Sequence, residues 1–326
     1  MLKFKYLFEN YDLAKTFINR YTHDQETLDD TLSHFRISAN AIYPFYANQK
    51  LQFLRLSPAC EKQLVCIQAE LEFLHYLNNN QFSALIPVKS LTGDFIITQQ
   101  TMWGEYHAVV FESVNGYAID DLHLTDTIVE SFGNTLGKLH LLSSQFNPNL
   151  KRKTHTDVFD WIESVYKTHN VSEEFMHQLM MNRLEMQSIQ MNKDNYGLIH
   201  YDYEIDNVFY DEKTLNCSVI DFDDSMYHFY VVDIIQALES LKEIVDESHW
   251  EYTKSLFLKA YENTGRNVSG IDSYFDIMRK FCHLYQYGRI MNSISEQRDD
   301  EPIWMTELRK KLIIKMRTLE KNITSH

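Results

Sequence analysis

The chain reads Leu198-Ile-His-Tyr-Asp-Tyr-Glu-Ile-Asp-Asn-Val-Phe-Tyr210 and then, after a polar segment, Val219-Ile-Asp-Phe-Asp-Asp224. The first stretch has the spacing His-x-Asp-x-x-x-x-Asn, and the second follows an apolar run with Asp-Phe. A phosphoryl-transfer site needs one carboxylate that orients a hydroxyl, and then an amide and a second carboxylate that hold magnesium on the phosphates. The order of these residue types therefore indicates a kinase.

The same stretches predict a hairpin that brings these side chains together. Short strands are expected at Val208–Tyr210 and Ser218–Ile220, because apolar residues there flank a polar turn segment. If the strands pair antiparallel, Asn207 lies beside Asp221, and an amide oxygen and a carboxylate converge as hard ligands suited to Mg²⁺. Asp202 then lies on the loop that crosses the mouth of the hairpin.

These motifs resemble the aminoglycoside phosphotransferase and choline kinase-like family, relatives of the protein kinases. That family carries a His-x-Asp-x-x-x-x-Asn loop followed by Ile-Asp-Phe-x-Asp. The resemblance implies that Asp202 is the catalytic base or hydroxyl-orienting group, and that Asn207 and Asp221 are the magnesium ligands. It also implies a buried structural role for His200. The matching positions are His200, Asp202, Asn207, Ile220, Asp221, Phe222 and Asp224.

Composition limits the class of protein. A chain of 326 residues with 20 Tyr, 20 Phe, 9 Gly and 5 Pro suits a large, helix-rich globular core. No apolar run suggests a signal peptide or the span of about 20 residues that a membrane helix needs. The 4 Cys are isolated, which favours reduced thiols and a cytoplasmic location. A net charge of −15 disfavours nucleic acid and membrane as partners and weakly favours a cationic substrate.

The chain before position 198 has the pattern of the smaller lobe of a kinase. A helical period of apolar residues runs from Lys62 to Leu77, between groups of strand-like segments. Three strands are predicted within 35–46 and 51–56, and three more at 84–87, 95–97 and 108–111.

Within that lobe, a kinase needs a cationic side chain on a strand, which contacts the nucleotide phosphates. It also needs a carboxylate side chain on the helix, which holds the cationic side chain in place. Arg55 occupies the strand position and Glu70 the helix position. The connection between the lobes is predicted after the last strand, where backbone groups from Glu112 to Val114 would meet the adenine edge.

Two positions depart from the kinase pattern. The first turn, Ser38–Asn40, has no glycine, whereas protein kinases cover the phosphates with a glycine-rich loop. Glu204 occupies the place where protein kinases carry lysine and this family often carries histidine. Two interpretations stay open for Glu204: either it points into the substrate pocket to meet a cationic group, or the activity is weak.

The second lobe is expected to be helical. A helix is predicted from Thr125 to Ser143, and its Leu-x-x-Leu-His segment, which ends at His140, resembles one that precedes the catalytic loop in the family. His140 is expected to be a packed core residue. A second helix follows the hairpin, and its Asp233 resembles the family residue that braces the catalytic loop. The resemblance implies that the C-terminal helices and a loop around Trp161 form the acceptor site.

The sequence thus predicts an α+β, two-lobed protein-kinase-like fold: a small N-lobe sheet with one helix, and a larger, mainly helical C-lobe. The N-lobe would span 1–113, with an N-terminal helical extension, and the C-lobe 114–326. The expected activity is ATP-dependent, Mg²⁺-assisted phosphorylation of a hydroxyl on a small polar molecule. A protein Ser/Thr kinase and an inactive, nucleotide-binding pseudokinase are the alternatives. Acceptors left open are aminoglycosides, amino alcohols, sugars and hydroxy amino acids.

Overall fold

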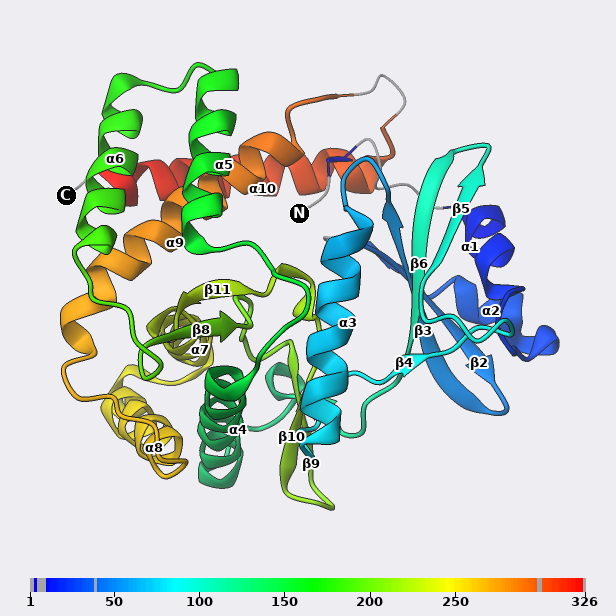
Figure 1. The fold of residues 1–326 in the computed structure, drawn as a ribbon, viewed down its shortest axis with the longest axis horizontal. Coiled ribbons are helices and arrows are strands. Elements are labelled where there is room, and N and C mark those ends of the chain that lie inside the picture. The colour runs from blue at the N-terminus through cyan, green and yellow to red at the C-terminus, as the bar shows by residue number, and fades with distance from the viewer. Residues whose placement is uncertain (1–2, 5–9, 38–39, 298–300, 325–326) are drawn as a thin grey trace.

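The computed structural model describes residues 3–4, 10–37, 40–297 and 301–324, which form two lobes side by side (Figure 1). An antiparallel sheet dominates the smaller lobe, and helices dominate the larger one. The predicted two-lobed α+β architecture is therefore confirmed. The chain leaves the sheet at Glu112 and enters the larger lobe at Tyr117, and we keep the division at residue 113 as a proposal.

The sheet of the smaller lobe has the order β1-β2-β3-β6-β4 among the described residues, with β5 also paired to β6. Every pairing in it is antiparallel, and β3 lies in the middle, where Arg55 is opposite Ile42 on one side and Val109 on the other. Its strands are β1 (Arg36–Ile37), β2 (Ala41–Ala47), β3 (Lys50–Pro58), β4 (Pro87–Val88), β5 (Ile97–Thr101) and β6 (Gly104–Glu112).

Helices cover both faces of this sheet. Helices α1 (Tyr11–Ile18) and α2 (Leu28–Leu32) pack on one face, where Phe17 and Leu54 share a buried apolar cluster. These helices are the predicted N-terminal extension. Helix α3 (Leu64–Asn79) lies on the other face, between the sheet and the larger lobe (Figure 1). Its start and end agree with the predicted helix to within two residues.

Two predicted strands are displaced, and the backbone bonding explains why. The strand expected at 84–87 is β4, which covers only Pro87–Val88. Residues 84 and 85 are bonded elsewhere, because Ala84 bridges to Val219 and the carbonyl of Leu85 accepts from the Asn78 side chain. The strand expected at 95–97 begins at Ile97 and continues to Thr101 as β5. The turn at Ser38 and Ala39, noted for its lack of glycine, lies outside the described residues.

The larger lobe combines short strands with long helices, as predicted. Strands β9 and β10 form the expected hairpin, β7 pairs with β9, and β8 pairs with β11. The strands are β7 (Tyr117–Ala118), β8 (Tyr196–Ile199), β9 (Val208–Asp211), β10 (Asn216–Val219) and β11 (Met226–Phe229). The helices are α4 (Asp126–Gln145), α5 (His155–Thr168), α6 (Glu173–Gln187), α7 (Val231–Ile244), α8 (Trp250–Glu262), α9 (Asp272–Ser293) and α10 (Ile303–Thr324). Its 3-10 turns in the described residues are η3 (Ile119–Asp121), η4 (Phe222–Asp224) and η5 (Glu247–His249), and a further turn, η2 (Gln25–Thr27), precedes α2 in the smaller lobe.

One buried apolar cluster crosses the junction of the lobes. It joins Phe73 and Leu77 of α3 to Phe132 of α4 and to Phe222 after the hairpin, and it also includes Phe111 of the sheet. The rings of Phe73 and Phe222 lie 5.9 Å apart between centroids. Because α3 contributes to this shared core, it fixes the sheet against the catalytic segment.

Helix α4 packs so closely on α8 that its glycines are required. A Cβ atom at Gly133 would lie 2.4 Å from the backbone oxygen of Phe257, and one at Gly137 would lie 2.4 Å from Oγ1 of Thr264. At these distances a side chain does not fit without displacement of the backbone. The close approach holds α4 directly behind the catalytic loop.

Helix α10 lies across the top of the view in Figure 1, from α6 toward the smaller lobe. At its first turn Met305 packs against Phe4, and the guanidinium of Arg309 lies 4.9 Å from the centroid of the Phe4 ring. None of the helices in the described part of the chain is both long and apolar enough to cross a membrane.

Candidate active site

The hairpin brings Asn207 and Asp221 to the same end of the larger lobe. Val208 pairs with Val219, and the ladder continues one step further, where the N–H of Ile220 donates to the carbonyl of Asn207 at 3.0 Å. Asn207, the residue before the first strand, therefore lies opposite Ile220, the residue before Asp221. The hairpin that the sequence predicted thus brings Asn207 and Asp221 to the same end of the two strands.

Asp202 lies within hydrogen-bond distance of Asn207. The Nδ2 atom of Asn207 donates to the carbonyl of Asp202 at 3.0 Å and to its Oδ2 at 3.2 Å. Burial raises the pKa of the Asp202 carboxyl; Arg289 opposes this effect and Asp224 adds to it. The two hydrogen bonds hold the Asn207 amide so that its Oδ1 is turned away from Asp202.

The catalytic loop is held from behind by buried hydrogen bonds. The carboxylate of Asp233 accepts from the backbone N–H of His200 at 2.8 Å and of Tyr201 at 2.7 Å, and from Nε2 of His140 at 3.1 Å. The Nδ1 atom of His140 contacts the hydroxyl of Tyr261 at 2.8 Å. His200 itself contacts the carbonyl of Ile220 through Nε2 at 2.8 Å. Both histidines are fully buried, so the structural positions predicted for them are confirmed.

Asp221 adopts a left-handed backbone, with φ 60° and ψ 58°, although it is not a glycine. Among the described residues, no hydrogen-bond donor reaches its carboxylate, and burial together with Asp223 and Asp202 raises its pKa to about 7. A partly buried carboxylate without a donor, beside a free amide oxygen, fits a divalent cation with oxygen ligands. The described part of the chain has no cluster of three or more His, Cys, Asp or Glu that could hold a metal by itself. This donor set therefore suits an ion shared with phosphate oxygens.

Arg55 and Glu70 form a buried, two-pronged ion pair. Nη1 and Nη2 of Arg55 donate to Oε1 and Oε2 of Glu70 at 2.8 and 2.7 Å. The sequence predicted both residues from the strand and helix positions that a kinase requires. In the structure the side chains of Arg55 and Glu70 contact each other, as expected from these positions.

Asp223 joins this pair to the larger lobe, and the sequence analysis did not assign it a role. Its Oδ1 lies 2.6 Å from Nζ of Lys62 and 3.6 Å from Nη1 of Arg55, and its Oδ2 accepts from Asn40 at 3.2 Å. Burial alone would raise the pKa of the Asp223 carboxyl, but Lys62 and Arg55 bring it well below its usual range. Asp223 could have been noticed as the second acid of the Asp-Phe-Asp-Asp run, whereas Lys62 had no signal beyond its place before α3.

Arg152 also holds the segment after Asp221. Its guanidinium donates to backbone carbonyls of Ser225 at 2.7 Å, Asp223 at 2.6 Å and, across the junction of the lobes, Cys66 of α3 at 3.1 Å. The sequence around Arg152 does not predict these contacts, because the partners of Arg152 lie 70 or more residues away in the sequence.

A second arginine, Arg289, contacts the same segment from α9 of the larger lobe. Its Nη2 donates to the carboxylate of Asp224, and its guanidinium lies 6.0 Å from the ring of Tyr201 and 5.4 Å from the ring of Tyr285. Tyr201 directly precedes Asp202, so Arg289 lies between the catalytic loop and the acidic run.

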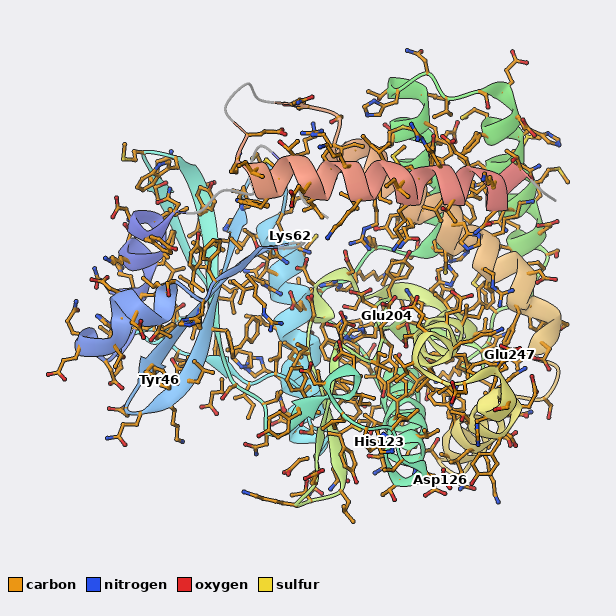
Figure 2. All side chains as sticks on the ribbon, turned by 180° about the vertical axis from the view of Figure 1, so that it is seen from behind. Tyr46, Lys62, His123, Asp126, Glu204 and Glu247 are labelled. Carbon is orange, nitrogen blue, oxygen red and sulfur yellow. The ribbon has the colours of Figure 1, made fainter. Side chains whose placement is uncertain are left out.

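The remaining predicted positions, Glu112, Val114 and Glu204, lie at the junction of the lobes. The N–H of Glu112 donates to the carbonyl of Ile86 at 3.0 Å, and among the described residues no partner holds the N–H of Val114. Figure 2 shows Lys62 of the smaller lobe and Glu204 of the larger one, both toward the middle of the molecule. Burial, Asp202 and a further loop acid raise the pKa of Glu204 to about 7.

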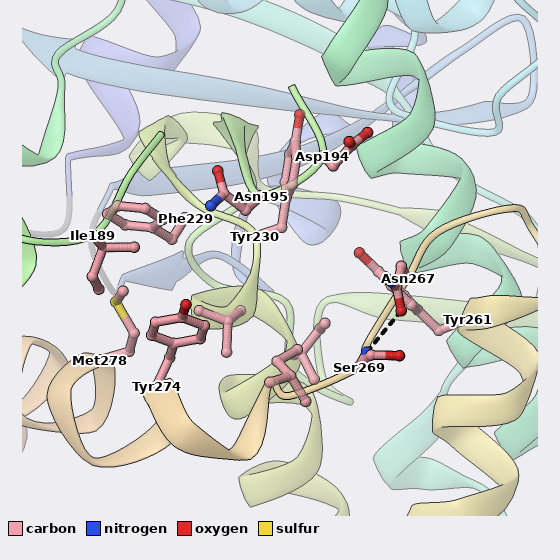
Figure 3. A pocket seen from close by; sticks show the side chains of 13 residues that line it. Ile189, Asp194, Asn195, Phe229, Tyr230, Tyr261, Asn267, Ser269, Tyr274 and Met278 are labelled. Atoms are coloured by element: carbon pink, nitrogen blue, oxygen red, sulfur yellow. Dashed lines mark hydrogen bonds between the residues drawn. The ribbon is translucent and has the colours of Figure 1, made fainter. Parts of the chain in front are cut away.

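A cavity of about 90 Å³ lies apart from these residues (Figure 3). Tyr230, Tyr261 and Met278 are among the side chains that line it, and none of the predicted site residues does. The hydroxyl of Tyr261, which lines this cavity, contacts His140. The cavity therefore lies behind His140 and Asp233, the residues that hold the catalytic loop.

Comparison with known proteins places the chain in a family. A model described as the phosphotransferase enzyme family matches residues 52–262, which is more than half of the 326 residues. The chain belongs to the phosphotransferase enzyme family. The matched span contains every predicted site residue, and the prediction that the protein is a phosphotransferase is confirmed.

Individual members of the phosphotransferase family support the same fold. Amicoumacin kinase of Bacillus subtilis (strain 168) is 23% identical over 232 residues, which are 67% of this chain and 68% of that protein. The structure of amicoumacin kinase hAmiN in complex with AMP-PNP, Ca²⁺ and Ami has a TM-score of 0.78 at 16% identity, and the match covers 99% of this chain and 95% of that one. A microcompartment-associated aminopropanol kinase has a TM-score of 0.71 at 19% identity, with coverages of 97% and 98%. The protein-kinase-like fold is therefore confirmed.

Proposed function

We propose that this phosphotransferase moves the γ-phosphoryl group of ATP to a hydroxyl of a small polar molecule. The observation that carries the proposal is the convergence of Asp202, Asn207 and Asp221 at the mouth of one hairpin, where Asn207 donates to Asp202 at 3.0 and 3.2 Å. The AMP-PNP complex of the amicoumacin kinase supports a nucleotide as phosphoryl donor.

Asp202 would orient the acceptor hydroxyl and take its proton. Its Oδ2 already accepts from Asn207, so Oδ1 is the atom available to the acceptor. Asn207, through Oδ1, and Asp221 would hold Mg²⁺. When bound, Mg²⁺ draws the β- and γ-phosphates together and offsets their charge.

The smaller lobe would hold the nucleotide. Arg55, fixed by Glu70, and the neighbouring Lys62 place two cations beside the acidic run. Backbone groups from Glu112 to Val114 are proposed to meet the adenine edge.

The acceptor is proposed to carry a positive charge as well as a hydroxyl. Glu204 lies on the catalytic loop and is largely buried beside Asp202, where a cationic group would compensate its charge. A net charge of −15 favours the approach of a cation. The relative named for aminopropanol, a small hydroxylated amine, supports this class.

Thermal unfolding tests the nucleotide site first. MgATP should raise the unfolding temperature, because a ligand at 100 times its dissociation constant stabilises the native state by about 2.7 kcal/mol, whereas ATP with EDTA should give a smaller shift. No shift at millimolar MgATP would contradict ATP as donor and favour a binding module without catalysis.

Phosphoryl transfer then tests the acceptor class. ADP formation should be faster with 1-amino-2-propanol than with 1,2-propanediol, which matches it in shape but lacks the positive charge. Equal rates with the two compounds would contradict a role for the charge. Transfer to proteins of a cell lysate and to neither compound would favour the protein kinase alternative.

A further inference from the structure

The catalytic loop carries acids where phosphoryl transfer calls for a cation. Asp202, Glu204 and Asp206 lie within five consecutive residues, and Glu204 stands where protein kinases carry lysine. A phosphoryl group in transfer bears negative charge on its oxygens, and fixed cations around it lower the barrier. The loop itself supplies no such cation.

The cations of the smaller lobe are already engaged on the nucleotide side. Arg55 is bonded to Glu70 through both Nη atoms, and Lys62 is bonded to Asp223. Neither belongs to the larger lobe, from which the acceptor would approach. A cation on the acceptor side must therefore come from another element.

Arg289 of α9 has the required position. Its guanidinium contacts Asp224 and lies over the rings of Tyr201 and Tyr285, at 6.0 and 5.4 Å. Arg289 has the largest effect of any charged neighbour on the pKa of Asp202. The side chain is 15% exposed, and no other described carboxylate pairs with it, so N–H groups remain for a ligand.

We propose that Arg289 contacts the phosphoryl group during transfer and supplies, from α9, the positive charge that the catalytic loop lacks. The inference rests on the proposed function. In the step, the bond between the γ-phosphorus and the bridging oxygen breaks, and its electron pair leaves with ADP. The acceptor oxygen forms its bond to the same phosphorus, and the acceptor proton passes to Asp202. Arg289 donates to the equatorial oxygens and is itself unchanged.

Binding of a transition-state analogue tests this role without an identified acceptor. MgADP with aluminium fluoride imitates the phosphoryl group in transfer, so the wild-type protein should bind it more tightly than MgADP. Arg289→Gln should keep the affinity for MgADP and lose about 100-fold in affinity for the analogue, the usual effect of removing one such donor. Arg289→Lys should recover part of the loss, because the charge is kept.

Arg279 provides a matched control on the same helix. It is a partly exposed arginine that donates to Glu239 at 2.6 Å and to Asp276, neither of which is a predicted site residue, so Arg279→Gln should bind both ligands like the wild type. Arg289→Lys also guards against a folding defect, since it retains the ion pair with Asp224.

A purely structural Arg289, acting only through Asp224, gives a different result. Asp224→Asn would then reproduce the full loss of Arg289→Gln, and the double variant would lose no more; that outcome overturns the proposal. Unaltered analogue binding by Arg289→Gln also overturns it. If the wild type binds neither MgADP nor the analogue, the proposed function itself fails, which separates the two conclusions.

Discussion

At the scale of single residues, the side chains of Asn207 and Asp221, the proposed cation ligands, are fixed by different means. Two hydrogen bonds from Nδ2 to Asp202 direct the amide oxygen of Asn207 away from that carboxylate. Asp221 instead adopts a left-handed backbone, which costs a residue with a side chain about 1–3 kcal/mol. Strain of this kind persists where surrounding contacts fix the segment, and Arg152 supplies such contacts through the carbonyls of Phe222 and Ser225.

Asp202→Asn should lower turnover by about 100- to 10,000-fold, the usual contribution of a general base, because the amide cannot take the acceptor proton. MgATP binding should persist, since the hydrogen bond from Asn207 can still be accepted. Steady-state ADP formation and nucleotide titration measure the two effects. Asp206→Asn, an exposed acid on the same loop, is the control, and a fully active Asp202→Asn would remove this residue from the mechanism.

The sequence predicted Asp202, Asn207 and Asp221 together because the hairpin that joins them is local. Arg289 could not be found in this way. It lies 65 residues from Asp224, on a helix whose direction depends on packing in the core rather than on any nearby motif. The same holds for Arg152. Local motifs thus predicted the groups that are proposed to act on the substrates, whereas the arginines around them required the tertiary fold.

At the scale of elements, capping and close packing determine how the helices of the larger lobe lie. Helix α5 begins with a capping box in which Thr154 and Asp157 satisfy each other's backbone N–H groups. The backbone N–H and hydroxyl of Thr154 both donate to Asp157 at 2.7 Å and hold the pKa of this carboxyl below its usual range. The expectation of a loop around Trp161 was wrong, because Trp161 lies in α5, whose capping box starts at Thr154.

The pH dependence of this box follows from the lowered pKa. Because the unfolded chain binds the proton more readily, the stabilisation is complete above the unfolded pKa of about 3.9 and is lost as pH falls below it. Asp157→Asn should cost about 0.5–1 kcal/mol at pH 7, since solvent screens this exposed site, and nothing near pH 2. Urea unfolding at both pH values checks this. Asp160→Asn, in an exposed ion pair on the same helix, is the control, and a difference that persists at pH 2 would contradict the prediction.

Gly133→Ala should destabilise the protein even though alanine favours helices. Its Cβ would lie 2.4 Å from the backbone oxygen of Phe257, and overpacking of this kind costs about 1–3 kcal/mol. The gain in helix propensity, about 1 kcal/mol, does not offset it. Chemical unfolding measures the difference. Lys138→Ala on the exposed side of α4 should be close to neutral, and a stabilised Gly133→Ala would show that α4 and α8 separate easily.

At the scale of the whole molecule, α3 connects the two lobes. One side of α3 holds Arg55 of the sheet through Glu70. On the other side, Glu72 accepts from the backbone N–H groups of Asn149 at 2.7 Å and Leu150 at 3.0 Å, in the segment that follows α4. The position of Glu70 beside Arg55 therefore depends on contacts with the larger lobe.

Glu72→Ala should lower stability by about 1 kcal/mol, because hydrogen bonds to a partly exposed carboxylate are lost. It should also raise the KM for MgATP more than it lowers kcat. The reason is that α3 positions Arg55, the proposed phosphate-binding residue, and does not position the acceptor. The control is Gln68→Ala, which removes an exposed side chain of α3. An unchanged KM would indicate that the shared core alone fixes α3.

The core that crosses the junction also has a consequence for unfolding. Since Phe73, Leu77 and Phe111 of the smaller lobe bury their side chains together with Phe132 and Phe222, neither lobe keeps a complete interior without the other. The chain should then melt as one cooperative unit, with equal calorimetric and van't Hoff enthalpies. A molecule that settles between the lobes would accordingly protect the entire chain against heat, not only the part that it touches.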